Sequence, residues 1–162
     1  MPSKTPPKTN ATRLLDNLDL AYELLAYKPG SDLSANAAAD LLGLPRAIVY
    51  KTILARGNLT GPLFACLSAE RELDLKALAI ATGDKKITLV AVKELQILTG
   101  YVRGGCSPLG ALKKFPVYLD EAILGPEKIA INAGAKGRLI LIRPEDLLVA
   151  TRGTLAVIAK KI

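Results

Sequence analysis

The chain has 162 residues, half of them hydrophobic, which suffices for one folded domain with a sizeable core. Its 22 lysines and arginines outnumber 15 aspartates and glutamates, and the net charge of +7 favours polyanionic partners such as RNA without identifying one. The chain has no histidine and two cysteines, which excludes Ser-His and Cys-His catalysis and histidine-ligated metals, so we expect no metal ion and no cofactor.

Hydropathy and cysteine content indicate a cytoplasmic protein. No apolar run approaches the roughly 18 residues of a membrane-spanning helix, so we expect no membrane association. The N-terminal lysines are not followed by the apolar segment of a signal peptide. The small number of cysteines is explained most simply by a reducing compartment.

The first eight residues contain three prolines and two lysines and are predicted to form a flexible basic tail, followed by a single domain over residues 9–162. Helices are predicted where a capping residue precedes an apolar segment or where a glycine or proline follows one. The expected helical ranges are 10–18, 34–42, 75–82, 91–98 and a helix that begins at Pro144.

Strands are predicted where β-branched and other apolar residues gather between turn residues. The turn at 57–61 makes its two flanking strands a hairpin. Because strands and helices alternate irregularly, the pattern indicates a mixed sheet with flanking helices rather than a doubly wound parallel sheet. The segment 154–159 fits a strand or a helix, and the expected strands are 21–27, 48–55, 63–68, 86–90, 116–119, 129–132 and 139–142.

The stretch 99–110 is the densest group of glycines in the chain, with four of the 13 in twelve residues. Glycines let backbone N–H groups approach a ligand closely. Ser107 followed by Pro108 is typical of a helix N-cap and first helical residue, which predicts a short helix from Leu109 to Lys114. The stretch matches neither a Walker loop nor a dinucleotide fingerprint. By spacing alone it is either an anion or carbonyl site at a helix start or a tight turn.

Two further residues allow two interpretations each. Lys51 alternates with apolar neighbours on a predicted strand, so its ammonium group either points into a cleft, where it can meet a phosphate, or is solvated. Tyr27 closes the first predicted strand and is either a pocket wall or an ordinary aromatic at the edge of the core.

These segments together resemble the YbaK/EbsC family, free-standing relatives of the editing domain inserted in bacterial prolyl-tRNA synthetases. The stretch 99–110 resembles the family's glycine-proline loop, and Val49-Tyr50-Lys51-Thr52 resembles a strand whose lysine faces the substrate pocket. The segments 73–79 and 133–139 resemble the start of a family helix and a late glycine-rich turn. The matches keep the family's order and cover roughly residues 18–148.

The resemblance implies an α+β fold with a curved mixed sheet of about six or seven strands, partly closed into a barrel, with helices around it. It also implies a trans-editing aminoacyl-tRNA deacylase, which hydrolyses the ester that joins a wrong amino acid to the 3′ end of a tRNA. Cysteine mischarged on proline tRNA is the leading substrate, and prolyl-tRNA synthetase is an expected partner. The alternatives are a deacylase for alanyl or seryl esters and a non-catalytic module that binds a tRNA end or a nucleotide.

The resemblance also assigns roles. Lys51 would hold the phosphate or ribose of the terminal adenosine, and Gly104 and Gly105 would offer backbone groups to the carbonyl or ribose, as an oxyanion hole does. The basic surface would attract the tRNA without reading its sequence. The expected substrate-binding residues are Tyr27, Tyr101, Arg103, Ser107 and Pro108, of which Ser107 and Pro108 would fix the loop.

One residue departs from the family pattern. Ile140 occupies the position at which the best-known cysteinyl-tRNA deacylases carry an aspartate near their pocket, so the accepted amino acid is left open. Cys106 lies in the glycine loop at a variable family position, and without a histidine base we do not expect it to be the nucleophile. The remaining nucleophiles are a water molecule and the substrate's own thiol, which an orienting pocket can position.

Overall fold

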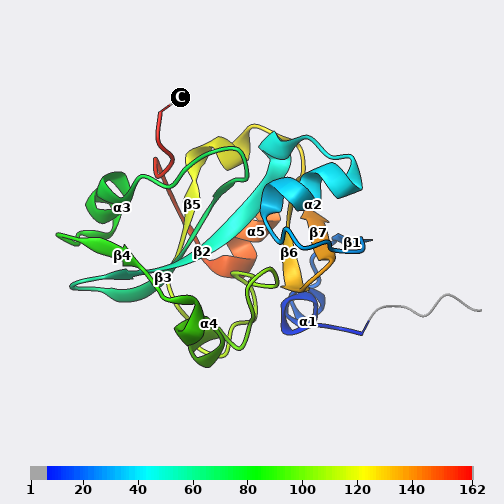
Figure 1. Ribbon diagram of the computed structural model, residues 1–162, viewed down its shortest axis with the longest axis horizontal. Coiled ribbons are helices and arrows are strands. Elements are labelled where there is room, and N and C mark those ends of the chain that lie inside the picture. Colours follow the sequence, from blue (N-terminus) through cyan, green and yellow to red (C-terminus); the bar gives the residue numbers. More distant parts are fainter. Residues whose placement is uncertain (1–6, 162) are drawn as a thin grey trace, which may run out of the picture.

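The computed structural model describes residues 7–161 and contains an eight-stranded mixed sheet with helices on both faces (Figure 1). The strands are β1 (Glu23–Ala26), β2 (Val49–Gly57), β3 (Gly61–Ser68), β4 (Ile87–Leu89), β5 (Val117–Asp120), β6 (Ile129–Ala135), β7 (Arg138–Ile142) and β8 (Thr154–Ala156). The helices are α1 (Asn10–Asn17), α2 (Ala35–Leu42), α3 (Leu75–Thr82), α4 (Val92–Thr99) and α5 (Pro144–Thr151), with short 3-10 turns η1 (Arg46–Ile48) and η2 (Glu121–Leu124). None of the helices in the described chain is long and apolar enough to cross a bilayer.

The predicted mixed α+β architecture is confirmed. The strand order is β1-β7-β6-β2-β3-β5-β8, with β4 paired to β2 beside this path. Three neighbouring pairs are parallel, namely β2–β6, β3–β5 and β5–β8, and the others are antiparallel. The segment 154–159, for which the sequence allowed a strand or a helix, contains β8. Within residues 7–161 the sheet does not close into a barrel, since β1 and β8 lie at its two ends.

Alternation along the strands separates two cores. On one face, inward residues such as Tyr50, Phe64 and Ile131 pack with Leu15 of α1 and Leu147 of α5. On the other face, two smaller clusters pack α2 and α3 against the sheet. Successive side chains of a strand point to opposite faces, so β2 contributes to both cores. β2 also crosses the centre of the molecule (Figure 1).

Capping residues set the helix ends, as the sequence predicts. The side chains of Thr9, Ser34 and Asp74 accept hydrogen bonds from backbone N–H groups in the first turns of α1, α2 and α3. Gly43 and Gly83 end α2 and α3 in the left-handed conformation that favours glycine. The hairpin of β2 and β3 is also confirmed.

The predicted short helix from Leu109 to Lys114 is wrong, because this segment is irregular. Ser107 does not cap a helix; its Oγ accepts a hydrogen bond from the N–H of Leu109 at 3.2 Å. Gly110 follows in the left-handed conformation, and a Cβ there would lie 2.5 Å from the backbone of Asn10. The chain therefore turns to pack against the start of α1 instead of continuing into a helix.

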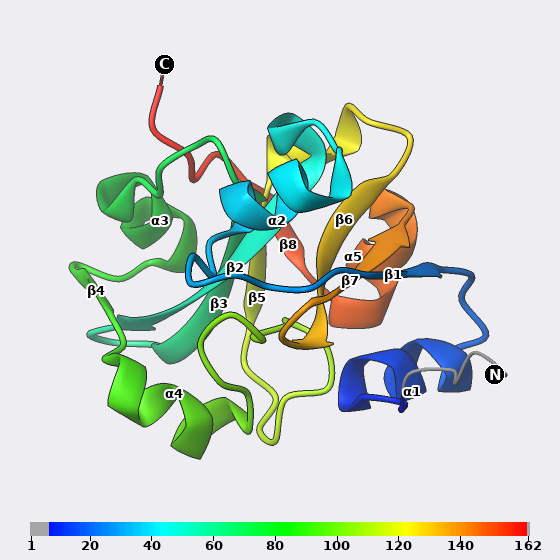
Figure 2. The ribbon, with the colours of Figure 1, turned by 45° about the vertical axis from the view of Figure 1, so that its right-hand side comes forward.

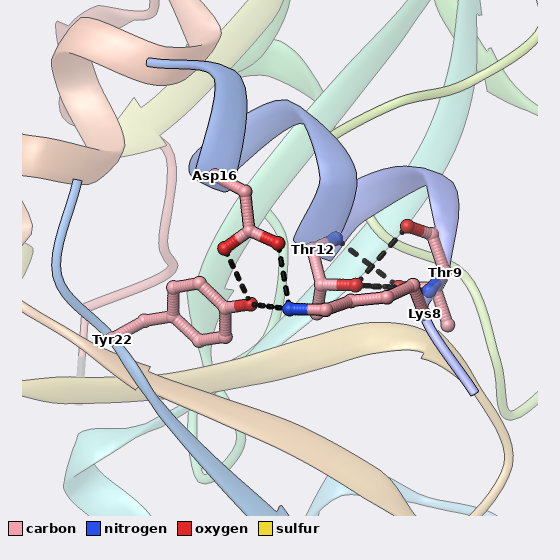
Figure 3. Close-up of polar contacts among 5 residues, drawn as sticks. All are labelled: Lys8, Thr9, Thr12, Asp16 and Tyr22. Carbon is pink, nitrogen blue, oxygen red and sulfur yellow. Dashed lines mark hydrogen bonds and ion pairs between the residues drawn. The ribbon is translucent and has the colours of Figure 1, made fainter. Parts of the chain in front are cut away.

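The start of the described chain is held against α1 and the segment before β1 (Figure 3). The Nζ of Lys8 lies 2.6 Å from a carboxylate oxygen of Asp16, whose other oxygen accepts a hydrogen bond from the Tyr22 hydroxyl at 3.0 Å. Thr9 and Thr12 form a reciprocal capping box. Residues 1–6 of the predicted basic tail lie outside the described residues.

Candidate active site

The middle of β2 has no strand partner on one of its edges in the described part of the chain. β3 pairs with β2 along the opposite edge, from Tyr50 to Gly57. On the first edge, β6 pairs only with Val49 and Tyr50, and β4 pairs with residues 55–57. The stretch 51–53 lies between these two partners. Parallel strands that part at their carboxyl ends leave a crevice, which is a common place for a ligand.

A cavity of about 380 Å³ lies at this crevice. Its walls come from the stretch 51–53 of β2, the start of α2, the first residue after β1, and the glycine loop that follows α4. Figure 2 shows α2 in front of β2 and this loop below it. The lining residues used below are Tyr27, Tyr50, Lys51, Thr52, Arg103, Gly104, Cys106, Asn132 and Leu139. The cavity therefore contains Tyr27, Lys51, Arg103 and Gly104, four of the residues predicted from the sequence.

Lys51 is half-buried, and its ammonium group donates a hydrogen bond to the carbonyl oxygen of Arg71. Burial lowers the pKa of Lys51 below its ordinary value, and the nearby Glu72 carboxylate opposes this shift. An ammonium group has three N–H donors, so two remain beyond this hydrogen bond. Arg103 is exposed at the cavity and adds a second cation.

Asn132 positions the glycine loop, and sequence analysis missed it. Its side-chain amide donates a hydrogen bond to the Gly104 carbonyl at 2.9 Å, while its oxygen accepts from the N–H groups of Gly134 and Ala135 at 2.7 and 3.1 Å. These contacts coincide with a register irregularity between β6 and β7. The available signal was an amide side chain in the otherwise apolar segment 129–135.

Gly104 and Gly105 have different environments. Gly104 lines the cavity with a φ of 82°, in the left-handed region. Gly105 does not line it; its N–H donates to the Val102 carbonyl at 2.9 Å. A Cβ on Gly105 would lie 3.1 Å from the backbone nitrogen of Lys136, so Gly105 allows close packing of the loop against the β6–β7 turn.

Neither cysteine is a reactive thiolate. Cys106 lines the cavity, and burial raises the pKa of its thiol to about 12. Burial likewise raises the pKa of Cys66 to about 12, although a hydrogen bond to Thr52 opposes the shift. Both thiols are therefore protonated near neutral pH, when they are poor nucleophiles.

Three predicted substrate-binding residues lie outside the cavity. Tyr101 is buried, and its hydroxyl donates to the Leu109 carbonyl at 2.5 Å, so it supports the loop from within. Ser107 is fully buried in the local turn described above. Pro108 lines a separate groove. Ile140, at the departing position, is fully buried in the core, whereas its neighbour Leu139 lines the cavity.

The cavity is suited to a ligand that combines a small uncharged side chain with a phosphate group. Its apolar walls and the Thr52 and Asn132 side chains can hold a small polar side chain, and Lys51 and Arg103 can meet a phosphate. Its lining contains no aspartate or glutamate among the described residues. In residues 7–161 there is also no group of three or more Cys, Asp or Glu side chains arranged to hold a metal ion.

Comparison with known proteins assigns this fold to a class. The family model of the aminoacyl-tRNA editing domain matches residues 32–149, and the chain belongs to this family. The resemblance found in the sequence is thus confirmed. The chain is 41% identical to EbsC of Enterococcus faecalis, named as a Cys-tRNA(Pro)/Cys-tRNA(Cys) deacylase, over 98% of this chain and 97% of that protein.

Other relatives are more distant. The multifunctional Ser/Thr-tRNA deacylase ProXp-y of Escherichia coli is 29% identical over 64% of this chain and 61% of that protein. A crystal structure described as a trans-editing enzyme for prolyl-tRNA synthetase superposes with a TM-score of 0.80 at 25% identity, covering 96% of this chain and all of that one. The hypothetical protein APE2540 shares the fold, with a TM-score of 0.86 at 22% identity over 94% of this chain and all of that one.

Proposed function

We propose that this protein is a trans-editing deacylase that hydrolyses the ester of mischarged aminoacyl-tRNA, with Cys-tRNA(Pro) as its substrate. The observation that carries the proposal is the stretch 51–53 of β2, between the segments paired with β6 and β4, where Lys51 lines a cavity whose walls include the glycine loop. The 41% identity to a protein named as a cysteinyl-tRNA deacylase supports the same substrate.

The residues of the cavity divide between the two parts of the substrate. Lys51 and Arg103 bind the phosphate or ribose of the terminal adenosine, since both are cations at the cavity. The N–H of Gly104, in the loop that Asn132 fixes through the Gly104 carbonyl, faces the ester carbonyl and stabilises the charge that develops on its oxygen. Tyr27 forms a wall. Gly105 acts through packing of the loop, because its N–H is already bonded to Val102.

The substrate's own thiol is the proposed nucleophile. The protein thiols are protonated, with pKa values of about 12, and the cavity lining offers no carboxylate base among the described residues. The cysteinyl sulfur attacks the ester carbonyl, the bond from the carbonyl carbon to the ribose oxygen breaks, and the thiol proton ends on that oxygen. The released thiolactone then reacts with water to give cysteine. Positioning of this kind can contribute about 7–11 kcal/mol to a reaction.

A second candidate is a deacylase for seryl or another small aminoacyl ester. The observation that favours it is the similarity to the E. coli protein named as a Ser/Thr-tRNA deacylase. A hydroxyl group is a weaker nucleophile than a thiol, so this activity would use a bound water molecule instead. A non-catalytic tRNA-end module would bind the same RNA without turnover.

A deacylation panel separates these candidates. The purified protein is incubated with cysteinyl, alanyl, seryl and threonyl esters of tRNA, and each rate is corrected for uncatalysed hydrolysis. We expect the cysteinyl ester to be cleaved fastest, and its S-methylated form to bind but resist cleavage. Equal cleavage of both cysteinyl esters would exclude attack by the substrate thiol, and no turnover of any ester would leave the binding module.

We further propose that prolyl-tRNA synthetase is the partner and the cytoplasm the location. A cavity for a terminal adenosine and basic contacts to a phosphate backbone give a free deacylase little power to distinguish tRNAs. Addition of the synthetase should raise kcat/KM for Cys-tRNA(Pro) more than for Cys-tRNA(Cys). An equal effect on both substrates, or none, contradicts this partner.

A further inference from the structure

A second hollow of about 570 Å³ lies on the other side of the glycine loop from the cavity. It is a groove formed by α1, α5 and the irregular segment 108–116, which we call the loop groove. Figure 2 shows α1 and α5 on the same side of the molecule, with this segment beside them. Apart from Pro108, no residue given a role in the reaction lines this groove, although it is larger than the cavity.

The loop groove carries one sign of charge. Lys113, Lys114 and Arg152 line it and are exposed, and its described lining contains no aspartate or glutamate. In residues 7–161 none of the three forms an ion pair, whereas cations elsewhere do, such as Arg46 with Asp40 and Lys8 with Asp16. Three cations without carboxylates beside them create a site for a polyanion.

Arg152 is held there at a cost in backbone conformation. It ends α5 with a φ of 52°, in the left-handed region that a residue with a Cβ adopts reluctantly. Gly153 follows directly and would adopt this conformation freely. An arginine kept at a strained position is a reason to look for a function of its side chain.

The groove also offers surfaces on which bases can stack. Phe115 is half-buried and packs edge to face on the buried Phe64, and the exposed Pro116 follows it, whereas Pro108 is buried in the groove wall. Cations next to aromatic and flat apolar side chains are the pattern by which proteins bind single-stranded RNA, because the cations meet phosphates and the rings stack on bases.

The groove and the cavity are joined by the glycine loop. Cys106 lines the cavity and Pro108 lines the groove, so their Cα atoms are at most about 7 Å apart. That distance is on the order of the spacing of one nucleotide along an RNA strand. We propose that the loop groove binds the single-stranded 3′ end of the tRNA, through the nucleotides that precede the aminoacylated adenosine in the cavity. This inference rests on the proposed function.

An acidic segment of a protein partner is negatively charged, as RNA is, and is the alternative occupant of the loop groove. The observations favour RNA, because Pro108 in the groove wall is two residues along the chain from Cys106 in the cavity wall and because the Phe115 ring accompanies the cations of the groove. A protein segment is an outcome that the experiment can detect.

The test compares two substrates that share the ester but differ in RNA length. The triple variant Lys113→Gln, Lys114→Gln, Arg152→Gln and the wild type are assayed on Cys-tRNA(Pro) and on the cysteinyl ester of adenosine alone. We expect the variant to raise KM for the tRNA about tenfold or more and to cleave the adenosine ester within about twofold of wild type. The slope of log(1/KM) against log salt should fall by about 2, because each contact to a single strand contributes about 0.7.

The matched control is Lys85→Gln, Lys86→Gln, which removes exposed cations near β4, away from the groove. It should leave both substrates and the salt slope unchanged. Fluorescence anisotropy of a non-aminoacylated RNA hairpin with a single-stranded CCA end tests binding to the groove without catalysis. The triple variant should bind this hairpin at least about tenfold more weakly than the control variant.

The outcomes separate the groove from the proposed function. A wild type that cleaves neither ester removes the function, and the anisotropy measurement still decides the groove. The groove is overturned as an RNA site if the triple variant matches the wild type in KM for the tRNA and in hairpin binding. It is also overturned if the variant loses cleavage of the tRNA ester and of the adenosine ester to the same extent. Unchanged hairpin binding by the triple variant, together with loss of the rise in kcat/KM on addition of prolyl-tRNA synthetase, shows a protein-binding groove and overturns the proposal as well.

Discussion

The cavity and the tip of the β2–β3 hairpin each hold a polar side chain that organises the backbone, the half-buried Asn132 in the cavity and the buried Asp84 at the tip. At the tip, the Asp84 carboxylate accepts hydrogen bonds from the N–H groups of Leu59 and Thr60, both at 2.8 Å, and from the hydroxyls of Thr60 and Thr82, both at 2.6 Å. In the cavity, Asn132 holds the glycine loop, while the ammonium group of Lys51 uses one of its three donors on the Arg71 carbonyl.

The more perturbed group belongs to the structural cluster. Burial alone would raise the pKa of Asp84, but the hydroxyl and backbone donors outweigh it and lower the pKa to about 2. The pKa of Lys51 is lowered by burial, without so complete a set of partners. Perturbed pKa values gather at functional sites, yet ion and hydrogen-bond networks produce them too. What distinguishes the cavity from the Asp84 cluster is that Lys51, whose ammonium group has N–H donors left over, lines a space large enough for a ligand.

Replacement of Lys51 by alanine should have the largest effect on deacylation. Loss of the ammonium group in the cavity should lower kcat/KM about tenfold or more, which corresponds to at least about 1.4 kcal/mol in the transition state. Thermal unfolding should change little, and the exposed Lys76→Ala on α3 should match wild type in both assays. Full activity in Lys51→Ala would remove this residue from the site.

The pH profile should show the same residue. Burial lowers the pKa of Lys51, so its charged form is lost at a lower pH than that of a free lysine. If the ammonium group binds substrate, activity corrected for uncatalysed hydrolysis should fall as pH rises through this lowered pKa. The alkaline fall should be missing from the residual activity of Lys51→Ala. Its persistence there would assign it to another group.

Asn132→Ala should have the next largest effect, a loss of about five- to tenfold in kcat/KM. The change leaves the Gly104 carbonyl and two backbone N–H groups without their partner, so the loop loses its fixed position. Asn58 is a matched control at the hairpin tip, because its side-chain oxygen also accepts from two backbone N–H groups, those of Lys85 and Lys86. Asn58→Ala should lose stability and keep activity; equal activity losses would remove the distinction between the regions.

The sequence was sufficient for features that local chemistry decides. Ser34, Asp74 and Gly43 mark helix ends through contacts within a few residues, and the hairpin follows from its turn. The cavity depends on pairing between β2 and β6, about 80 residues apart, which no local pattern specifies. The failed helix after Pro108 has the same cause, because Gly110 packs against α1 near the other end of the chain.

The positions of single side chains were predicted less well for the same reason. Lys51 lines the cavity, the position that strand alternation and the family motif both favour, while its role stays a prediction. Tyr101 lies in the glycine loop, where the sequence predicts contact with the substrate, yet its side chain turns inward and its hydroxyl donates to the Leu109 carbonyl. Asn132 carried no recognised motif, and its role becomes visible only when β6 and the glycine loop, 28 residues away, lie together.

Cys106→Ala should have a small effect, within about twofold of wild type. The thiol lines the cavity, but its pKa of about 12 keeps it protonated at neutral pH, so it contributes volume rather than reactivity. Gly105→Ala is the informative comparison, because the new Cβ would press on the backbone of Lys136 and displace the loop. It should reduce kcat/KM several-fold. Lost activity in a folded Cys106→Ala would instead indicate thiol chemistry.

Asp84→Asn should have the smallest effect on deacylation, none beyond error, while it changes stability in a pH-dependent way. The folded-state pKa of Asp84 is about 2, below the unfolded value of about 3.9, so the ionised carboxylate stabilises the fold fully above about pH 4. This contribution is lost as pH falls from about 4 toward 2. The wild type should therefore unfold at a higher temperature than Asp84→Asn at pH 7.

The two unfolding temperatures should approach each other as the pH falls through that window. Gly57→Ala supplies an independent check on the same cluster, because a Cβ there would lie 2.0 Å from the Asp84 carboxylate. It should destabilise the fold at pH 7 without a catalytic defect in the folded fraction. A difference between wild type and Asp84→Asn that stays constant from pH 7 to pH 2 would mean that the ionised carboxylate does not provide the stabilisation. A specific loss of deacylation in either variant would mean that the hairpin tip, which lines no part of the cavity, belongs to the active site after all.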